Sequence, residues 1–493
     1  MTGEVETADV LIAGAGPVGA TLALLLAKAG HRVSIVERDA DVYPLPRAAH
    51  IDHEVLRLLN MVGAAAPVVA DSQPLSSYEF RAGDGSLLMG FKTGKALAPT
   101  GFPPSSMFHQ PTLEFALRDA IAENPLVTLS IETTLTGFVA SDDGVTATVH
   151  GPDGERDIAA RYLIGCDGGA SIVRKLCQIS MEDMGFDEPW LVIDARLKNG
   201  VERLSTVGIQ HCDPARPVTA MPMSPGRHRW EFMMRPGETA DEVTTDAAID
   251  AMIAPFADPA SVEVDRRAVY RFHAVIAHEW RKGRVLLAGD AVHQMPPFLG
   301  QGLCSGVRDA ANLAWKLDAV MKGEAGDKLL DSYQVERSPH VRSITEMAVF
   351  MGQVVCTQDA GKAAARDKDM LSVPEDRRMN PLPPPARLTS GIVEGDPAAG
   401  QVAPEPWLAD GKARVDDLVG YAPVLYAREN IDRDGFAGGG RVVSLASLAD
   451  KDSALAAMMG EAPAMLVRPD RIVFGLGDPT ALLESWDAYL RRG

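Results

Sequence analysis

Glycines and acidic residues occur together at three widely separated places in this chain of 493 residues. Glycine turns let a backbone approach phosphate groups closely, and carboxylates accept hydrogen bonds from sugar hydroxyls. The three places therefore favour one nucleotide-type cofactor that is held by segments drawn from most of the chain. They are Gly14-Ala15-Gly16-Pro17-Val18-Gly19, Cys166-Asp167-Gly168-Gly169, and Gly289-Asp290 with Pro296-Pro297 and Gly300-Gln301-Gly302.

The first motif lies between elements that suit it. Residues 9–13 form an apolar run typical of a buried parallel strand, residues 17–28 an Ala-rich helix, and residues 32–36 a second strand. In this setting the first glycine permits the turn, the second admits a pyrophosphate and the third lets the helix pack on the strand. Glu37, with Arg38 beside it, lies where a carboxylate binds ribose hydroxyls. The motif alone does not distinguish NAD from FAD.

The two later motifs also follow expected strands. Residues 157–165 lead to Asp167, which either binds the cofactor or caps a helix over residues 170–176. Residues 284–288 lead to Asp290. Pro296-Pro297 requires an extended turn, and a long helix over residues 303–321 follows it. The amino terminus of that helix could stabilise negative charge on a cofactor.

Composition narrows the class of protein. The net charge of −19 argues against nucleic-acid binding, which requires a basic surface. Five cysteines without C-x-x-C spacing argue against disulfides and against a zinc site, so we expect no metal. The apolar stretch at residues 17–30 is too short to span a bilayer, and Glu4 and Glu6 are unlike a signal peptide. We expect a cytoplasmic protein with no membrane or nucleic-acid partner.

Three stretches resemble the class A flavoprotein monooxygenases, the aromatic hydroxylases of p-hydroxybenzoate hydroxylase type: 11–37, 162–174 and 284–317. The resemblance implies an α/β fold in which a Rossmann-like FAD-binding domain carries an inserted β-sheet substrate domain. It implies FAD as cofactor, with NADH or NADPH and O2 as cosubstrates. The family residues that would contact FAD correspond here to Gly14, Gly16, Gly19, Glu37, Arg38, Arg47, Gln110, Asp167, Gly168, Asp290, Gly300, Gly302, Leu303 and Cys304.

A closer resemblance is to 3-(3-hydroxyphenyl)propionate hydroxylases, carried by residues 47–52, 212–217, 231–233 with 236–239, and 308–310 with 312–316. It implies hydroxylation of a phenolic substrate, either this acid or a related phenol, through a flavin C4a-hydroperoxide. A bulkier polyketide-like aromatic substrate is an alternative, as is a flavin oxidase or epoxidase. A flavin-binding protein without activity should have lost Arg47, Gln110, Asp290 and Pro296-Pro297, which this chain keeps. It departs from the family at Cys304, where Asn is usual.

The resemblance also suggests roles around the flavin. Arg47 would contact the reductant or move the flavin, and Pro296-Pro297 would form a wall beside the reacting oxygen. His293 is a candidate catalytic residue, although a local hydrogen-bonding role suits it better than that of a base. Arg216 could meet a substrate carboxylate or form a surface salt bridge. Three further residues would line an apolar substrate pocket or belong to the core: Met221, Met223 and Phe232.

The resemblance and the pattern of turns suggest a division into domains. The FAD-binding domain would comprise residues 1–70, 105–180 and 276–352, and the substrate sheet residues 71–104 and 181–275. Residues 353–400, with Pro381, Pro383, Pro384 and Pro385, would form a linker. Residues 401–493 resemble a thioredoxin-like domain, which without C-x-x-C would serve packing or dimerisation. A homodimer is one possible assembly.

Overall fold

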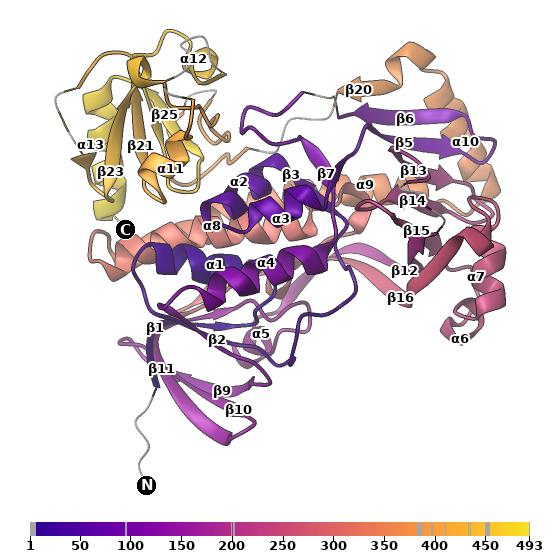
Figure 1. Cartoon of the computed structure of the whole chain (residues 1–493), viewed down its shortest axis with the longest axis horizontal. Helices are drawn as coiled ribbons and strands as arrows, with labels where there is room; N and C mark the ends of the chain where they lie inside the picture. Colours follow the sequence, from indigo (N-terminus) through magenta and orange to yellow (C-terminus); the bar gives the residue numbers. More distant parts are fainter. Residues whose placement is uncertain are drawn as a thin grey trace.

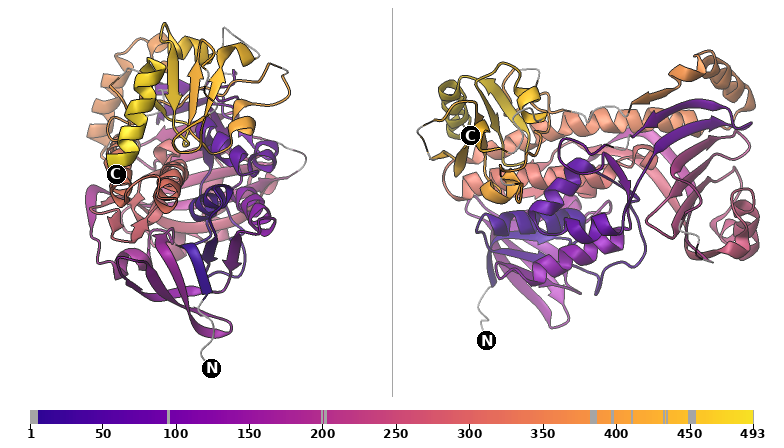
Figure 2. Two further views of the ribbon diagram at one scale, coloured as in Figure 1. Left: turned by 90° about the vertical axis from the view of Figure 1, so that its left-hand side faces the viewer. Right: turned by 45° about the horizontal axis from the view of Figure 1, so that its top comes forward.

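The computed structural model describes residues 6–93, 96–198, 200, 203–381, 387–395, 398–409, 411–431, 433, 435–448 and 454–492. Figure 1 shows a sheet near the amino terminus, a second sheet at the right of the view and a C-terminal unit in yellow. In Figure 2 the C-terminal unit and the second sheet lie at opposite ends of two long helices, α8 (Gly302–Met321) and α9 (Asp331–Val355).

The sheet near the amino terminus, here the N-terminal sheet, is built around β1 (Glu6–Ala13). Its main path in the described residues is β17-β18-β11-β1-β2-β8, in which β1 is parallel to both β2 and β11. The helices α1 and α4 pack together on this sheet, and α8 packs on α1. Bounds are β2 (Val33–Val36), β8 (Val127–Ser130), β11 (Gly154–Gly165), β17 (Arg281–Lys282), β18 (Val285–Leu287), α1 (Pro17–Lys28), α4 (Gln110–Ala122) and α5 (Ile172–Leu176).

The carboxyl ends of the central strands therefore meet at one edge, as they do where open α/β sheets bind ligands. The expected strands before Gly14, Gly168 and Gly289, and the expected helices after them, are confirmed within one to three residues. An antiparallel extension, β9 (Thr134–Ala140) and β10 (Val145–Gly151), joins the first half of β11. Two helices pack against the helical layer of this sheet, α3 (Ala65–Ala70) on α4 and α2 (His53–Met61) on α8. A small sheet is formed by β3 (His50–Asp52), β4 (Gln73–Pro74) and β7 (Ser105–Met107).

The second sheet, here the middle sheet, has the order β19-β16-β12-β15-β14-β13-β5-β6-β20 in the described residues. Its two longest strands, β12 and β16, continue as one antiparallel ribbon back to the N-terminal sheet. Bounds are β5 (Ser77–Ala82), β6 (Leu87–Lys92), β12 (Met181–Leu197), β13 (Val207–Cys212), β14 (Val218–Pro222), β15 (Arg227–Met233), β16 (Val262–Ala277), β19 (His293–Gln294), β20 (Met379–Pro381), α6 (Ala240–Val243) and α7 (Asp246–Ile253).

The segment expected as a linker, residues 353–400, is more ordered than its composition indicates. It contains α10 (Ala360–Leu371), whose Met370 and Leu371 pack against the apolar cluster of the middle sheet. It also contains β20, which pairs in parallel with β6. Pro383, Pro384 and Pro385 lie outside the described residues. The sequence missed these elements because their apolar residues are sparse and find their partners only in the folded chain.

The C-terminal unit is a mixed sheet in the order β22-β23-β21-β24-β25 in the part of the chain described. Trp486 joins its core to Trp315 of α8, with ring centroids 5.6 Å apart. Its likeness to thioredoxin stays a prediction, as do the exact domain boundaries. Bounds are β21 (Val424–Ala427), β22 (Gly435–Phe436), β23 (Gly440–Ser444), β24 (Ala464–Val467), β25 (Val473–Gly477), α11 (Val415–Val419), α12 (Ala454–Met459) and α13 (Pro479–Arg492). None of the helices in the described ranges has the length and apolarity needed to cross a membrane.

Candidate functional site

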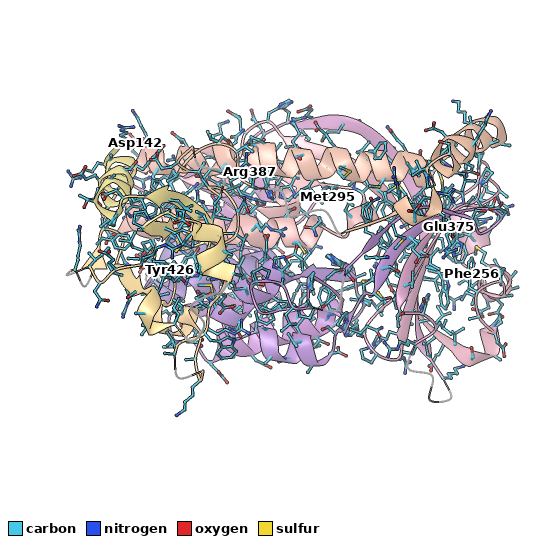
Figure 3. The ribbon with its side chains drawn as sticks, turned by 90° about the horizontal axis from the view of Figure 1, so that it is seen from above. Asp142, Phe256, Met295, Glu375, Arg387 and Tyr426 are labelled. Carbon is cyan, nitrogen blue, oxygen red and sulfur yellow. The ribbon has the colours of Figure 1, made fainter. Side chains whose placement is uncertain are left out.

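A cavity of about 1060 Å³ runs from the carboxyl edge of the N-terminal sheet to the inner face of the middle sheet. Met295, labelled in Figure 3, is one of its lining residues and lies between the C-terminal unit, marked by Tyr426, and the far end of the middle sheet, marked by Phe256. Most of the expected site residues line it: Gly14, Gly16, Glu37, Arg38, Arg47, Gln110, Asp167, Gly168, Met221, Asp290, Pro297, Gly300, Gly302 and Leu303.

The first glycine turn has the geometry of a phosphate cradle. Gly14 has a φ of +99°, and a Cβ there would lie 2.4 Å from the Cys166 carbonyl oxygen. A Cβ on Gly19 would lie 2.1 Å from the Gly14 carbonyl oxygen, so this glycine permits close helix packing instead of lining the cavity. A Cβ on Gly16, in contrast, would meet no atom within 4 Å. Because no side chain caps α1, its first amides are available to an anion in the space beside Gly16.

Glu37 ends β2 at the same edge. Its two carboxylate oxygens accept hydrogen bonds from the amides of Ala15, at 2.7 Å, and Asp39, at 3.0 Å. These bonds hold the carboxylate beside the glycine turn and leave lone pairs directed at the cavity that Glu37 lines. Its position suits the two hydroxyls of an adenosine ribose.

Asp167 caps a helix, one of the two roles expected for it, and leaves one oxygen available for the other. One carboxylate oxygen, Oδ2, accepts from the amides of Ile172 and Val173 at 2.6 and 3.1 Å and so caps α5. The other, Oδ1, is buried and has no hydrogen-bond partner among the described residues. A buried acceptor of this kind is costly unless a ligand satisfies it, and Asp167 lines the cavity. Asp290 lines the same cavity, and its enclosure by protein raises the pKa of its carboxyl group.

Gln110 holds the loop that carries Arg47. Its Oε1 accepts from the Ala48 amide at 2.6 Å, and its Nε2 donates to Glu114 at 2.6 Å. The Arg47 guanidinium lies over the Tyr43 ring, 4.7 Å from the centroid. Gln110 thus positions the loop. The Arg47 side chain faces the cavity, where it stacks on Tyr43 and forms no ion pair with an acid among the residues that the structure describes.

Arg229 ties this loop to the middle sheet, a role that the sequence did not reveal. Its guanidinium donates to the carbonyl oxygens of Pro46 and Arg47, each at 2.8 Å. It also makes a two-point ion pair with Asp194, at 2.7 and 3.0 Å. The planar fork of arginine suits four such bonds at once. A displacement of the Arg47 loop would therefore alter hydrogen bonds to Arg229 and so act directly on the strand that carries it.

The turn before α8 forms the next wall. Gly300 adopts a φ of +62°, its carbonyl oxygen lies 3.1 Å from His50 Nδ1, and no side chain caps the helix. Free amides at this end can stabilise negative charge on a ligand. Cys304 is fully buried behind this turn, outside the cavity lining, and burial raises the pKa of its thiol far above the usual range. Its side chain therefore does not reach the cavity.

Phe298 anchors the proline turn to the middle sheet. Its ring makes edge contacts with Trp190 and Phe272, at centroid distances of 5.7 and 6.3 Å. Its carbonyl oxygen accepts from the Tyr78 hydroxyl at 2.9 Å. Pro297 lines the cavity, whereas Pro296 does not and serves the shape of the turn.

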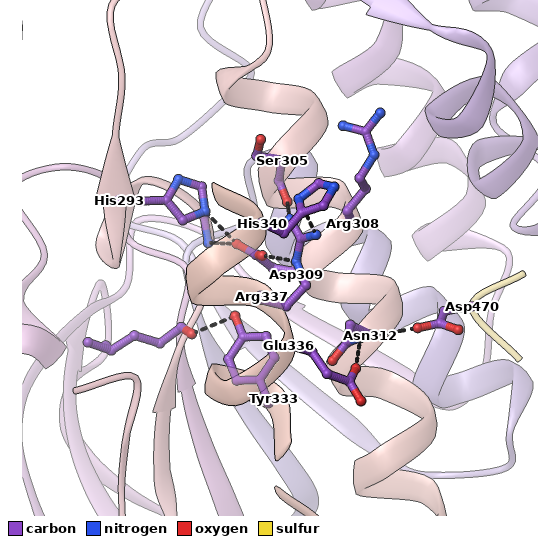
Figure 4. Close-up of polar contacts among 12 residues, drawn as sticks. His293, Ser305, Arg308, Asp309, Asn312, Tyr333, Glu336, Arg337, His340 and Asp470 are labelled. Atoms are coloured by element: carbon purple, nitrogen blue, oxygen red, sulfur yellow. Dashed lines mark hydrogen bonds and ion pairs between the residues drawn. The ribbon is translucent and has the colours of Figure 1, made fainter. Parts of the chain in front are cut away.

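His293 lies behind the site and does not line the cavity. Its Nε2 is 2.7 Å from Asp309, whose carboxylate also accepts from the Gly289 amide at 3.1 Å and from Arg337 at 2.8 Å (Figure 4). Arg337 in turn lies 2.8 Å from His340. This buried network supports the local hydrogen-bonding role expected for His293 and shows no contact that would make it a catalytic base.

The expected substrate residues are only partly brought together. Met221 lines the cavity. Met223 does not line it but is buried directly behind lining residues such as Met107, and Phe232 is buried in a separate core cluster. Arg216 forms a salt bridge with Glu238, which was one of the two roles considered for it. The cavity wall carries instead polar residues that the sequence did not single out, namely Tyr78, Gln210, Thr219 and Glu231. The alternation of residues along β14 and β15 was the available signal, but it does not tell which face is inward.

The comparisons with known proteins agree with this geometry. Residues 7–348 match a family model described as an FAD binding domain. The chain is 35% identical to a probable NADH-specific resorcinol 4-hydroxylase of Rhodococcus jostii (strain RHA1), over 97% of this chain and 93% of that protein. It is 39% identical to a 3-(3-hydroxy-phenyl)propionate/3-hydroxycinnamic acid hydroxylase of Mycobacterium sp. (strain JLS), over 73% of this chain but only 62% of the relative's length.

Solved structures resemble the whole chain. Aklavinone-11 hydroxylase, solved with FAD and aklavinone, has a TM-score of 0.80 at 28% identity, over 98% of both chains. Anhydrotetracycline hydroxylase from Streptomyces rimosus has a TM-score of 0.79 at 26% identity, over 98% of this chain and 99% of that one. In the part of the chain that the structure describes, no group of His, Cys, Asp or Glu could hold a metal ion.

Proposed function

We propose, from the premise that this chain belongs to the FAD-binding-domain family of flavoprotein aromatic hydroxylases, that it hydroxylates a small neutral phenol of the resorcinol class with NADH and O2. The family membership rests on the match over residues 7–348 and on relatives 35–39% identical. The substrate class and the use of NADH are proposed in addition to this family membership.

The cavity fits FAD on three grounds. Gly16 leaves open space beside the uncapped start of α1, Glu37 is held at the end of β2, and Asp167 keeps an unpartnered buried oxygen in the wall. When bound, FAD supplies the hydride acceptance and oxygen transfer that side chains cannot perform. The protein holds the cofactor, orients the phenol and keeps water away from the reacting atoms.

Glu231 is the observation that favours a neutral substrate. It lines the cavity on the middle sheet and its side chain is 7% exposed. Two cations on the same wall are already paired, Arg229 with Asp194 and Arg271 with Asp187. A substrate carboxylate placed at this wall would meet an acid instead of a free cation, whereas a phenol hydroxyl would find an acceptor. The full-length match to a resorcinol hydroxylase points the same way.

A second candidate is 3-(3-hydroxyphenyl)propionate. Arg271 and His273 line the cavity where their side chains are 57% and 43% exposed. A propionate arm that reached this exposed region could displace Asp187 from them, with the ring still in the interior.

The test is a phenol panel with the purified holoenzyme, in which resorcinol, phenol and 3-(3-hydroxyphenyl)propionate are each supplied with NADH or NADPH. The proposal expects NADH consumption that depends on resorcinol and forms a hydroxylated product in near-equal amount. Faster, coupled turnover of the propionate acid would favour the second candidate. NADH consumption that yields only hydrogen peroxide with every phenol would indicate an oxidase.

We also propose a cytoplasmic protein that forms a homodimer. All five cysteines are free, as is usual for thiols in a reducing compartment. Exposed Val335 and Phe350 on α9 offer apolar area to a second copy. Sedimentation of the holoenzyme at a mass of one chain at all concentrations would count against the dimer.

A further inference from the structure

A row of polar side chains crosses three strands of the middle sheet. Gln210 on β13 is paired with Thr219 on β14, and Thr219 is paired with Glu231 on β15. Directly paired residues point to the same face of a sheet, and all three line the cavity. Their neighbours in that wall include the apolar Met221 and Phe298. The row is thus a line of adjacent polar groups on the inner face of the sheet, and a few placed polar groups in a pocket are what orients a ligand.

Hydrogen bonds fix the orientation of the side chains at the Gln210 end of the row. The Thr219 hydroxyl donates to Gln210 Oε1 at 2.8 Å, and Gln210 Nε2 donates to the Tyr78 hydroxyl oxygen at 2.6 Å. The Tyr78 hydroxyl then donates to the Phe298 carbonyl oxygen at 2.9 Å, in the turn beside the cofactor site. Burial raises the pKa of Tyr78 far above its usual range. These side chains therefore hold a fixed arrangement but cannot take up a proton near neutral pH.

Glu231 differs from the rest of the row. Its closest charged partner is Arg229 on its own strand, with Nη1 3.8 Å from Oε1, and its carboxylate has no hydrogen bond to a described residue. The other charged or titratable groups that act on it are Asp194 on β12, Arg266 on β16 and Tyr78 on β5. Burial raises the pKa of Glu231 to about 7. Asp194 adds to this rise, and Arg229 opposes it.

We propose that Glu231 accepts the hydroxyl proton of the phenolic substrate, with the Thr219 and Gln210 side chains beside it to position the ring. The inference rests on the proposed function and adds a residue to it. The substrate O–H bond breaks, its proton goes to the Glu231 carboxylate, and the electron pair stays on oxygen. The ring becomes more electron-rich at the carbons ortho and para to that oxygen.

The proton balance closes over one turnover. A ring carbon gains one oxygen atom of O2 and releases its hydrogen as a proton, which is used in the water formed from the other oxygen atom. Glu231 then returns the first proton to the original hydroxyl oxygen. The carboxylate is unchanged at the end, and the reaction needs no oxidant or reductant besides the O2 and NADH of the proposed activity. A base whose pKa lies near the working pH is the most effective one for such a transfer.

The test compares wild type, Glu231→Gln, Glu231→Asp and the control Glu263→Gln, each as FAD-loaded enzyme with resorcinol and NADH. Glu263 is an exposed acid on β16 of the same sheet, paired with Arg196. Product kcat/KM is measured from about pH 5.5 to about pH 9. We expect wild type and Glu263→Gln to rise with pH through the pKa of Glu231. Glu231→Gln should lose roughly 100-fold in kcat/KM and lose this rise, and Glu231→Asp should keep a rise at lower rate.

Each outcome decides the inference. If Glu231→Gln binds FAD yet keeps the wild-type pH rise with a loss below about threefold, the inference is overturned while the proposed function stands. If Glu231→Gln does not fold, wild type decides, because a kcat/KM that is flat between about pH 6 and about pH 8 excludes this proton acceptor. If wild type forms no hydroxylated product from any phenol, the proposed function itself has failed.

Discussion

The imidazole of His293 and the carboxylate of Asp309 form a fully buried pair, with Nε2 2.7 Å from Oδ2. The same carboxylate oxygen accepts from the Gly289 amide, and its partner oxygen accepts from Arg337 (Figure 4). The side chain of Asp309 on α8 thus holds the turn that presents Asp290 to the cavity, and it links that turn to α9. The expected cofactor contact at Asp290 therefore depends on a residue outside the cavity.

Asp309→Asn should destabilise the protein and weaken FAD binding together. The change leaves Arg337 buried without its counter-charge, and removal of one partner from a buried ion pair costs roughly 3–5 kcal/mol. Thermal unfolding with and without added FAD measures both effects. A variant that unfolds at the wild-type temperature and keeps its FAD would show that the network does not support the turn.

Gly16→Ala should separate folding from cofactor binding. A Cβ at Gly16 meets no protein atom within 4 Å, so the apoprotein should fold normally, but the methyl group would occupy the space proposed for the pyrophosphate. We expect FAD affinity to fall by about tenfold or more, which corresponds to about 1.4 kcal/mol. Titration of the apoprotein with FAD measures this.

Gly14→Ala provides the contrasting variant. Its Cβ would lie 2.4 Å from a backbone oxygen and its φ is positive, so the change should impair folding itself. If Gly16→Ala bound FAD as tightly as wild type, the phosphates would have to lie elsewhere.

Arg229→Lys should slow reduction of the enzyme by NADH more than it lowers stability. Lysine keeps the charge near Asp194 but cannot also donate to both carbonyl oxygens of the Arg47 loop. Stopped-flow reduction of the bound FAD checks the effect, with Arg196→Lys, an exposed arginine of the neighbouring strand β12 that does not line the cavity, as control. Equal reduction rates in the two variants would show that the hydrogen bonds from Arg229 to the Arg47 loop do not affect reduction.

Acid should weaken the contact between the C-terminal unit and the two long helices. Burial opposes ionisation of Glu336, but Arg468 and Lys316 outweigh it and lower its pKa from 4.5 to about 2. A carboxyl group with a lowered pKa contributes stability above its unfolded value, and the contribution is lost as the pH falls toward the folded value. The unfolding temperature should therefore fall between about pH 4.5 and about pH 2.

Glu336→Gln should reduce that dependence on pH while it lowers stability at neutral pH. Arg468 Nη2 lies 2.8 Å from the Glu336 carboxylate, and both side chains are fully buried. An unfolding temperature that falls equally steeply in wild type and variant below about pH 4.5 would assign the effect to other carboxylates, such as Asp416.

The sequence predicted which residues meet at the glycine-rich end of the cavity because its signals there are local. The turn at Gly14, the end of β2 at Glu37 and the start of α8 each follow from a strand and helix contiguous with them, and all line one cavity. Gln110 and Arg47 came only from resemblance, and their bonds show that Gln110 acts on the loop backbone.

The substrate end was predicted less well because it depends on pairings between distant strands. Thr219 and Glu231 lie side by side only through the register of β14 with β15, and Tyr78 reaches Gln210 across 132 residues of sequence. Phe232, an attractive pocket residue by type, alternates with Glu231 and so faces the core. The formation of regular structure at α10 and β20 likewise depends on contacts that no local pattern encodes.

The most direct measurement is the fate of isotopically labelled O2 supplied to the purified holoenzyme with NADH and resorcinol. A single labelled oxygen atom in each molecule of trihydroxybenzene product, with NADH consumed in near-equal amount, is the expected result. Product without the label, or labelled hydrogen peroxide with the phenol recovered unchanged, would show that this cavity does not insert oxygen into an aromatic ring.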